Sequence, residues 1–78
     1  MNKFFETYDI FLSSTLVSLD FSLYRLDRKG GKRVKFLFER KEGLDEAIQG
    51  FWGRRLNIEP QILFASLKML KSRIYSND

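Results

Sequence analysis

Few side chains in this sequence could perform catalysis. Its 78 residues include no cysteine and no histidine, which removes thiolate nucleophiles, the commonest general base and the usual zinc ligands. The Lys-Gly-Gly-Lys segment at 29–32 lacks the spacing of a phosphate-binding loop. Negative charge is favourable in the first turns of a helix, and this explains a cluster of carboxylates better than paired acid–base catalysis does: Glu39, Glu42, Asp45 and Glu46. We therefore expect no enzyme activity, no cofactor, no metal and no small-molecule substrate.

Basic residues are concentrated in one stretch of the chain. Residues 25–41 carry eight basic and two acidic side chains, so the whole net charge of +4 arises there. A basic two-stranded ribbon can enter a major groove or lie along phosphates. The candidate nucleic-acid contacts are Arg25, Arg28, Lys29, Lys32, Arg33 and Lys35. An alternative reading is that these charges only solvate the ribbon and discourage edge-to-edge sheet pairing.

The basic stretch lies in a segment, residues 21–40, that has the pattern of an antiparallel β-hairpin. Val34, Phe36 and Phe38 alternate with more polar positions, as in a strand that buries one face. Gly30-Gly31 can adopt the positive φ angles of a tight turn. A hairpin is marginally stable alone, so other elements must cover at least one face.

Two registers are compatible with this hairpin. A three-residue loop would place Leu26 opposite Val34 and Tyr24 opposite Phe36, which gathers large apolar side chains on one face. A two-residue loop would instead place Arg25 opposite Phe36. We favour the first register because it builds the better core face.

In the favoured register, Leu23 and Leu37 pair on the outer face of the hairpin. If helices cover only the other face, these leucines form an exposed apolar spot, which indicates a protein partner or a homodimer. Aromatic residues could also stack on bases. We expect Tyr24, Phe36 and Trp52 to lie in the core instead, because their spacing places them on buried faces.

Three segments have the apolar spacing of helices, at residues 8–19, 42–53 and 60–75. Thr7 is a candidate N-cap for the first, and Pro60 suits the first turn of the third. Residues 56–58 are a candidate third strand. The order α-β-β-α-α predicts a single α+β domain, residues 1–78, with helices packed on one face of a small antiparallel sheet.

The chain has no obvious targeting or membrane segment. Its apolar run at residues 10–19 is too short to span a bilayer and follows acidic rather than basic residues, unlike a signal peptide. The absence of cysteine fits a reducing compartment. These features predict a cytoplasmic protein that does not bind membranes.

Several motifs resemble those of a family of short, uncharacterised prokaryotic and phage-associated domains. They are the segments at residues 5–9, 33–39, 51–52 and 67–75, namely Phe-Glu-Thr-Tyr-Asp, Arg-Val-Lys-Phe-Leu-Phe-Glu, Phe-Trp and Leu-Lys-Met-Leu-Lys-Ser-Arg-Ile-Tyr. Asp20 departs from the pattern where a glycine usually closes the first helix, and Lys41 where Ser or Asp often opens the second. The resemblance supports the architecture and a phage or mobile-element setting, and it implies no activity. We predict a small nucleic-acid-binding domain, or alternatively a protein–protein module.

Overall fold

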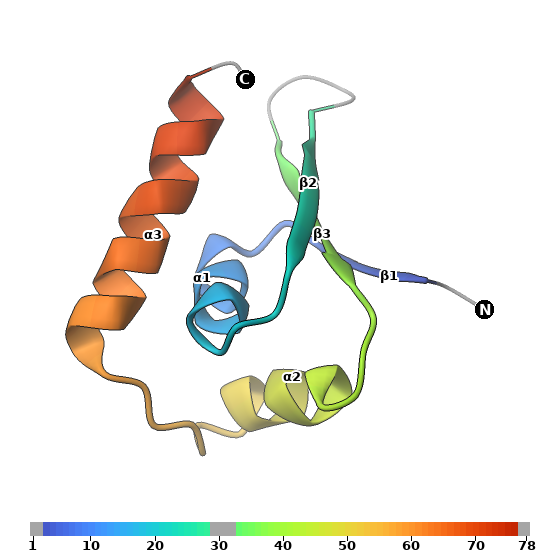
Figure 1. Ribbon diagram of the computed structural model, residues 1–78, viewed down its shortest axis with the longest axis vertical. Helices are drawn as coiled ribbons and strands as arrows, with labels where there is room; N and C mark the ends of the chain where they lie inside the picture. Colours follow the sequence, from blue (N-terminus) through green and yellow to red (C-terminus); the bar gives the residue numbers. More distant parts are fainter. Residues whose placement is uncertain (1–2, 29–32, 77–78) are drawn as a thin grey trace.

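A computed structural model describes residues 3–28 and 33–76. It confirms the α+β class, with three helices packed against a three-stranded antiparallel sheet (Figure 1). The elements follow in the order β1 (Phe4–Thr7), α1 (Ile10–Ser18), β2 (Leu23–Asp27), β3 (Lys35–Glu39), α2 (Leu44–Trp52) and α3 (Pro60–Tyr75).

The third strand of the sheet is β1, at the start of the chain, and the sequence analysis did not predict it. The strand order is β1-β3-β2, so β3 lies in the centre and pairs with both neighbours. The prediction of a strand at residues 56–58 is wrong, because this segment is irregular and lies between α2 and α3. The predicted order α-β-β-α-α therefore lacks its first element.

Both predicted hairpin registers are wrong near the turn. Leu26 pairs with Phe36 rather than with Val34, and Arg25 pairs with Leu37. Farther from the turn, a β-bulge between Leu23 and Arg25 inserts one extra residue into β2 and shifts the register again, so that Leu23 pairs with Phe38. The bulge lets Leu23 and Leu26, three residues apart, pair with the two core phenylalanines of β3. The predicted three-residue turn falls on residues 29–31, outside the described residues.

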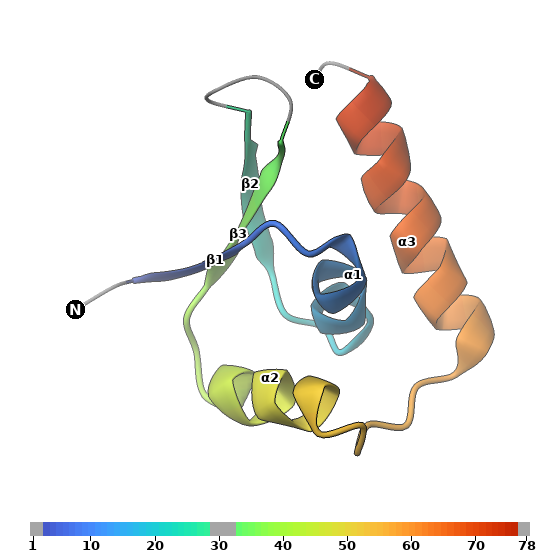
Figure 2. The ribbon, with the colours of Figure 1, turned by 180° about the vertical axis from the view of Figure 1, so that it is seen from behind.

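The core lies between the helices and one face of β3. Phe36 and Phe38 are almost completely buried there, as the alternation in this strand predicts. Residues from all three helices complete the cluster: Leu12, Leu16, Leu44, Ala47 and Leu70. Figure 2 shows the same layering from behind, with α1 between the sheet and α3. The opposite face of the sheet is not covered by a helix.

Helix α1 has an unusual distribution of side chains, because it buries hydroxyl groups and exposes a phenylalanine. Ser13 and Ser14 are at most 1% exposed. Their hydroxyls donate to the carbonyl oxygens four residues earlier, at 2.9 and 2.7 Å, so burial leaves them satisfied. Ser18 in addition donates to the hydroxyl of Ser66 at 3.0 Å, which joins α1 to α3. Small side chains thus allow these two helices to approach closely.

Residues close in sequence cap and end the helices, and the N-cap of α1 differs from the predicted one. Asp9, rather than Thr7, caps α1, because its carboxylate accepts from the backbone N–H groups of Phe11 and Leu12 at 2.8 and 3.0 Å. Asp20, just after α1, adopts φ 70°, the left-handed conformation in which a glycine would be least strained. Helix α3 has the predicted bounds, with Pro60 in its first turn.

Gly50 lies close to the segment that follows α2. A Cβ atom at this position would lie 2.8 Å from Cδ2 of Leu56, so a larger residue would require the Leu56 side chain to shift. The Arg55 N–H also donates to the Gly50 carbonyl oxygen at 2.9 Å. These contacts tie residues 55 and 56 to the end of α2, and the segment then leads into α3.

Candidate nucleic-acid interface

The uncovered face of the sheet brings aromatic and charged side chains together. Opposite residues in antiparallel strands share a face, so the observed register places one set of residues on the side away from the helices. We define the outer sheet face by Phe4, Glu6, Tyr8, Tyr24, Arg25, Asp27, Arg33, Lys35, Leu37 and Glu39. Three of the six predicted nucleic-acid contacts belong to it.

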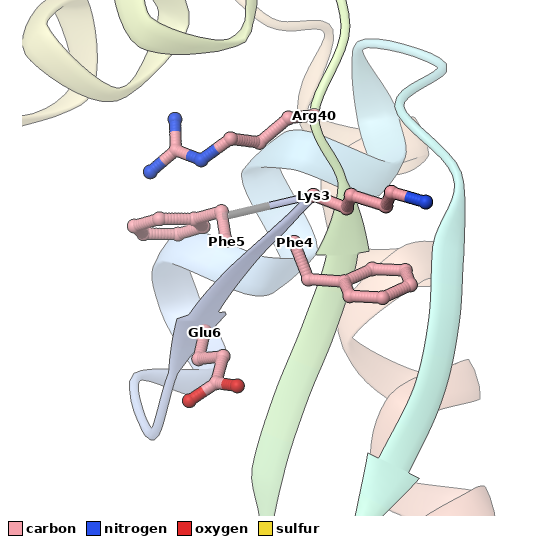
Figure 3. A pocket seen from close by; sticks show the side chains of 5 residues that line it. All are labelled: Lys3, Phe4, Phe5, Glu6 and Arg40. Carbon is pink, nitrogen blue, oxygen red and sulfur yellow. The ribbon is translucent and has the colours of Figure 1, made fainter. Parts of the chain in front are cut away.

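The centre of the outer sheet face is closed by two rings from the edge strands. The ring centroids of Phe4 on β1 and Tyr24 on β2 are 4.5 Å apart, although β3 lies between these strands. The rings must therefore meet above β3, and Figure 3 shows Phe4 pointing toward β2. Leu37 of β3 is only 5% exposed as a result. Tyr24 keeps 53% of its surface exposed.

Each exposed tyrosine of this face lies beside an arginine. The guanidinium carbon of Arg33 is 3.9 Å from the centroid of the Tyr8 ring. That of Arg25 is 6.0 Å from the centroid of Tyr24. A guanidinium within about 6 Å of a ring face is attracted by the ring quadrupole. Neither arginine forms a salt bridge with another described residue, so both can reach an anion.

Lys35 is held on the same face by a carboxylate. Its Nζ lies 3.2 Å from Oε1 of Glu6 and 5.7 Å from the centroid of the Tyr8 ring. The hydrogen bond to Glu6 and the charge of that carboxylate raise the pKa of Lys35 above its ordinary value of 10.5. Lys35 therefore stays charged at neutral pH, with part of its charge neutralised by Glu6.

Arg28 was predicted to contact phosphates at the hairpin tip, and its side chain instead reaches α3. Its Nη2 donates to the carbonyl oxygen of Arg73 at 2.7 Å, near the C-terminal end of that helix. Unsatisfied carbonyls at a helix C-terminus favour such a cation. The remaining two predicted contacts, Lys29 and Lys32, lie outside the described residues.

An open hollow of about 400 Å³ lies at the β1 edge of the sheet (Figure 3). Lys3 and Arg40 contribute positive charge to its lining, and Phe4, Phe5 and Glu6 complete it. The Arg40 guanidinium is engaged by Asp45, at 2.8 Å between Nη1 and Oδ1. Lys3, Phe4 and Tyr8 were not predicted to be site residues. The alternation of Phe4, Glu6 and Tyr8 in the sequence indicates that these side chains share one face, and it could have identified Phe4 and Tyr8.

The structure corrects the predicted pairing of the two leucines. Leu23 pairs with Phe38 and packs against the core, because the bulge reverses its side. Leu37 is buried beneath the outer sheet face. These two residues therefore do not form the exposed apolar spot that the favoured register predicts. A protein or homodimer interface at Leu23 and Leu37 is not supported by this arrangement.

Of the three aromatic residues predicted to lie in the core, one is buried and two are exposed. Phe36 is buried, as predicted. The prediction for Tyr24 is wrong, because the bulge turns this side chain to the outer sheet face. The prediction for Trp52 is also wrong, because this side chain is 63% exposed at the last turn of α2 and no element among the described residues covers it.

In the described part of the chain, no group of three or more His, Cys, Asp or Glu side chains is arranged to hold a metal ion. Within residues 3–28 and 33–76, no helix is long and apolar enough to cross a membrane. No protein-family model, curated protein or solved structure matches the chain. The resemblance to phage-associated domains therefore stays a prediction.

Proposed function

We propose that this chain is a non-enzymatic domain that binds single-stranded nucleic acid on its outer sheet face. The observation that carries the proposal is the pairing of two exposed tyrosines with two arginines, Tyr8 with Arg33 and Tyr24 with Arg25. Aromatic rings offer stacking surfaces to unpaired bases, and neighbouring cations attract the phosphates. A duplex would not expose its bases to these rings.

The charges on this face do not favour strong electrostatic attraction to phosphates, so we expect nucleic acid to bind with moderate affinity. Glu6 forms an ion pair with Lys35, and Asp27 and Glu39 add two more carboxylates to this face, which therefore carries three basic and three acidic side chains. Arg25 and Arg33 form no ion pair with another described residue. Each neutralised phosphate of a single strand contributes a slope of about 0.7 in log affinity against log salt. We expect a slope of roughly 1 to 2. Stacking then carries a large share of the affinity.

The cytoplasmic location and the phage or mobile-element setting belong to the same proposal. They rest on the composition and on the family resemblance. The absence of histidine and cysteine supports the non-enzymatic part.

Fluorescence anisotropy with labelled oligothymidine, oligouridine and a duplex of the same length tests the proposal. We expect the single strands to bind more tightly than the duplex. Tyr24→Ser should weaken single-strand binding by roughly 5- to 100-fold, because each stacked base contributes about 1–3 kcal/mol. Equal affinity for duplex and single strand, or unchanged affinity of this variant, would contradict base stacking.

Charge-reversed variants separate the outer sheet face from general attraction to a basic protein. Arg25→Glu with Arg33→Glu should abolish binding and leave the fold intact, because both side chains are on the surface. Arg54→Glu with Arg55→Glu is the matched control, since it makes the same change in net charge on exposed residues between α2 and α3. If the two double variants lose affinity equally, the outer sheet face is not the binding site.

A further inference from the structure

A second surface, on the helical side of the molecule, exposes large aromatic side chains. Phe11 of α1, Trp52 of α2 and Phe64 of α3 are 63%, 63% and 64% exposed. Phe51 lies among them, and its ring packs edge-on against Trp52 with centroids 4.9 Å apart. We call Phe11, Phe51, Trp52 and Phe64 the helical aromatic patch. Contiguous apolar surface of this kind on a small domain marks an interaction site.

Three members of the patch line an apolar pocket at the junction of the three helices, and the fourth, Trp52, contacts one of them, Phe51. The pocket has a volume of about 170 Å³, and Phe11, Phe51, Leu63, Phe64 and Leu67 supply its apolar lining. A second hollow, of about 300 Å³, adjoins it and shares Phe51 and Leu63. Together they form a groove that runs between α1, the end of α2 and the first half of α3. Its lining matches the grooves into which amphipathic helices insert apolar side chains.

The composition of α1 supports an external role for Phe11. This helix buries Ser13 and Ser14 while it exposes Phe11, although hydrophobic burial alone would favour the opposite arrangement. Internal packing therefore does not explain a phenylalanine at this position. Contact with a partner would cover it.

Charge beside the groove indicates the chemistry of that partner. Helix α3 carries three basic residues and no acidic one over its sixteen residues. Lys68 lies four residues after Phe64, and Lys71 lies three residues after Lys68, so all three side chains share one stripe of the helix. Arg54 lines the adjoining hollow. The nearby carboxylates of Asp9 and Glu59 are engaged in capping α1 and α3.

We propose that the helical aromatic patch binds an acidic amphipathic helix of a partner protein. Apolar side chains of that helix would enter the groove, and its carboxylates would face Lys68, Lys71 and Arg54. A second copy of this chain fits less well, because a two-fold contact would bring the two cationic stripes together. This binding site is separate from the outer sheet face and does not depend on nucleic-acid binding.

Two synthetic helical peptides test the proposal directly. One carries Leu and Phe on one face and Glu on the other, and the second replaces every Glu with Lys. Trp52 is the only tryptophan and reports binding by fluorescence, while ¹⁵N NMR shifts locate the peptide. We expect the acidic peptide to bind roughly tenfold more tightly or better, because like charges oppose the second one. The shifts should centre on Phe11, Phe51 and Phe64.

Variants of exposed residues provide the controls. Phe64→Ser should abolish binding of the acidic peptide, and Lys68→Glu with Lys71→Glu should reverse the preference between the peptides. Ile62→Ser is the matched control: it also removes an apolar side chain that is about half exposed, but it lies about 200° around α3 from Phe64. It should bind normally. Thermal unfolding of each variant shows that it is folded.

Four results would overturn the proposal. They are equal affinity for the two peptides, no binding of either peptide at millimolar concentration, shifts confined to the sheet, and unchanged binding by Phe64→Ser. Analytical ultracentrifugation adds a fifth: a dimer of the wild type that Phe64→Ser dissociates would identify a second copy as the occupant.

Discussion

The outer sheet face and the helical aromatic patch contain similar residues but differ in how those residues are covered. On the outer sheet face, Phe4 and Tyr24 contact each other and bury Leu37 beneath them. On the helical side, Phe11 and Phe64 border an apolar pocket and remain nearly two-thirds exposed. Aromatic rings close the first surface and leave the second open.

The spacing of the elements explains this contrast. Neighbouring strands lie about 4.8 Å apart, so rings on β1 and β2 can meet across β3. Packed helices lie about 8–10 Å apart, so rings on adjacent helices line a groove instead of closing it. The number of exposed aromatic residues is therefore a poor guide to function. The geometry between them distinguishes a platform for flat ligands from a groove for a helix.

The first prediction, with the largest expected effect, compares the loss of stability when one residue of each surface is replaced by alanine. Leu37→Ala should lower the free energy of unfolding by about 2 kcal/mol, because it empties a closed site. Phe11→Ala should change it by less than about 0.5 kcal/mol, because its ring is largely exposed. Urea unfolding of both variants measures the difference. Similar losses for the two would mean that the helical aromatic patch is as closed as the sheet face.

The second prediction concerns Asp9, which lies in the chain between Tyr8 of one surface and Phe11 of the other. Asp9→Ala should cost about 1 kcal/mol of stability, because two backbone N–H groups at the start of α1 lose their acceptor. Asp9→Ser retains a capping oxygen and is the control. Thermal unfolding measures both, and an equal loss for the serine variant would show that the cap is not the cause.

The third and smallest effect is the titration of Lys35 on the outer sheet face. Glu6 raises its pKa, so the folded state holds this proton more tightly than the unfolded state. The resulting stabilisation is complete below the ordinary lysine pKa of 10.5 and is lost as the pH rises through the raised value. NMR titration of the Lys35 side chain should show this pKa, and Glu6→Gln should lower it. An identical titration curve in that variant would exclude the ion pair.

Much of the fold could be predicted from local patterns. Helix α3 has the predicted bounds because Pro60 and an apolar stripe define it within one segment. The alternation in β3 correctly placed Phe36 and Phe38 in the core. Strand β1 was missed because four residues show too little pattern. Its conformation depends on pairing with β3, about thirty residues further along the chain.

The candidate sites were predictable only in part. Arg25, Arg33 and Lys35 lie on one face, as a basic hairpin implies, whereas Arg28 binds the end of α3. Tyr24 was assigned to the wrong face because it lies in the bulge between Leu23 and Arg25, where the alternation of side chains is interrupted. Trp52 continues the apolar pattern of α2 but extends beyond the elements that could cover it.

The amino-acid sequence was sufficient to predict the three helices, the two strands of the hairpin, the concentration of basic charge and the absence of histidine and cysteine chemistry. These follow from composition and from the period of apolar residues, which are local properties. Only the tertiary structure decided which side of β2 carries Tyr24, which strand flanks β3 and which aromatic rings remain exposed. Periodicity aligns side chains along one element, but burial depends on a neighbour that comes from a distant part of the chain.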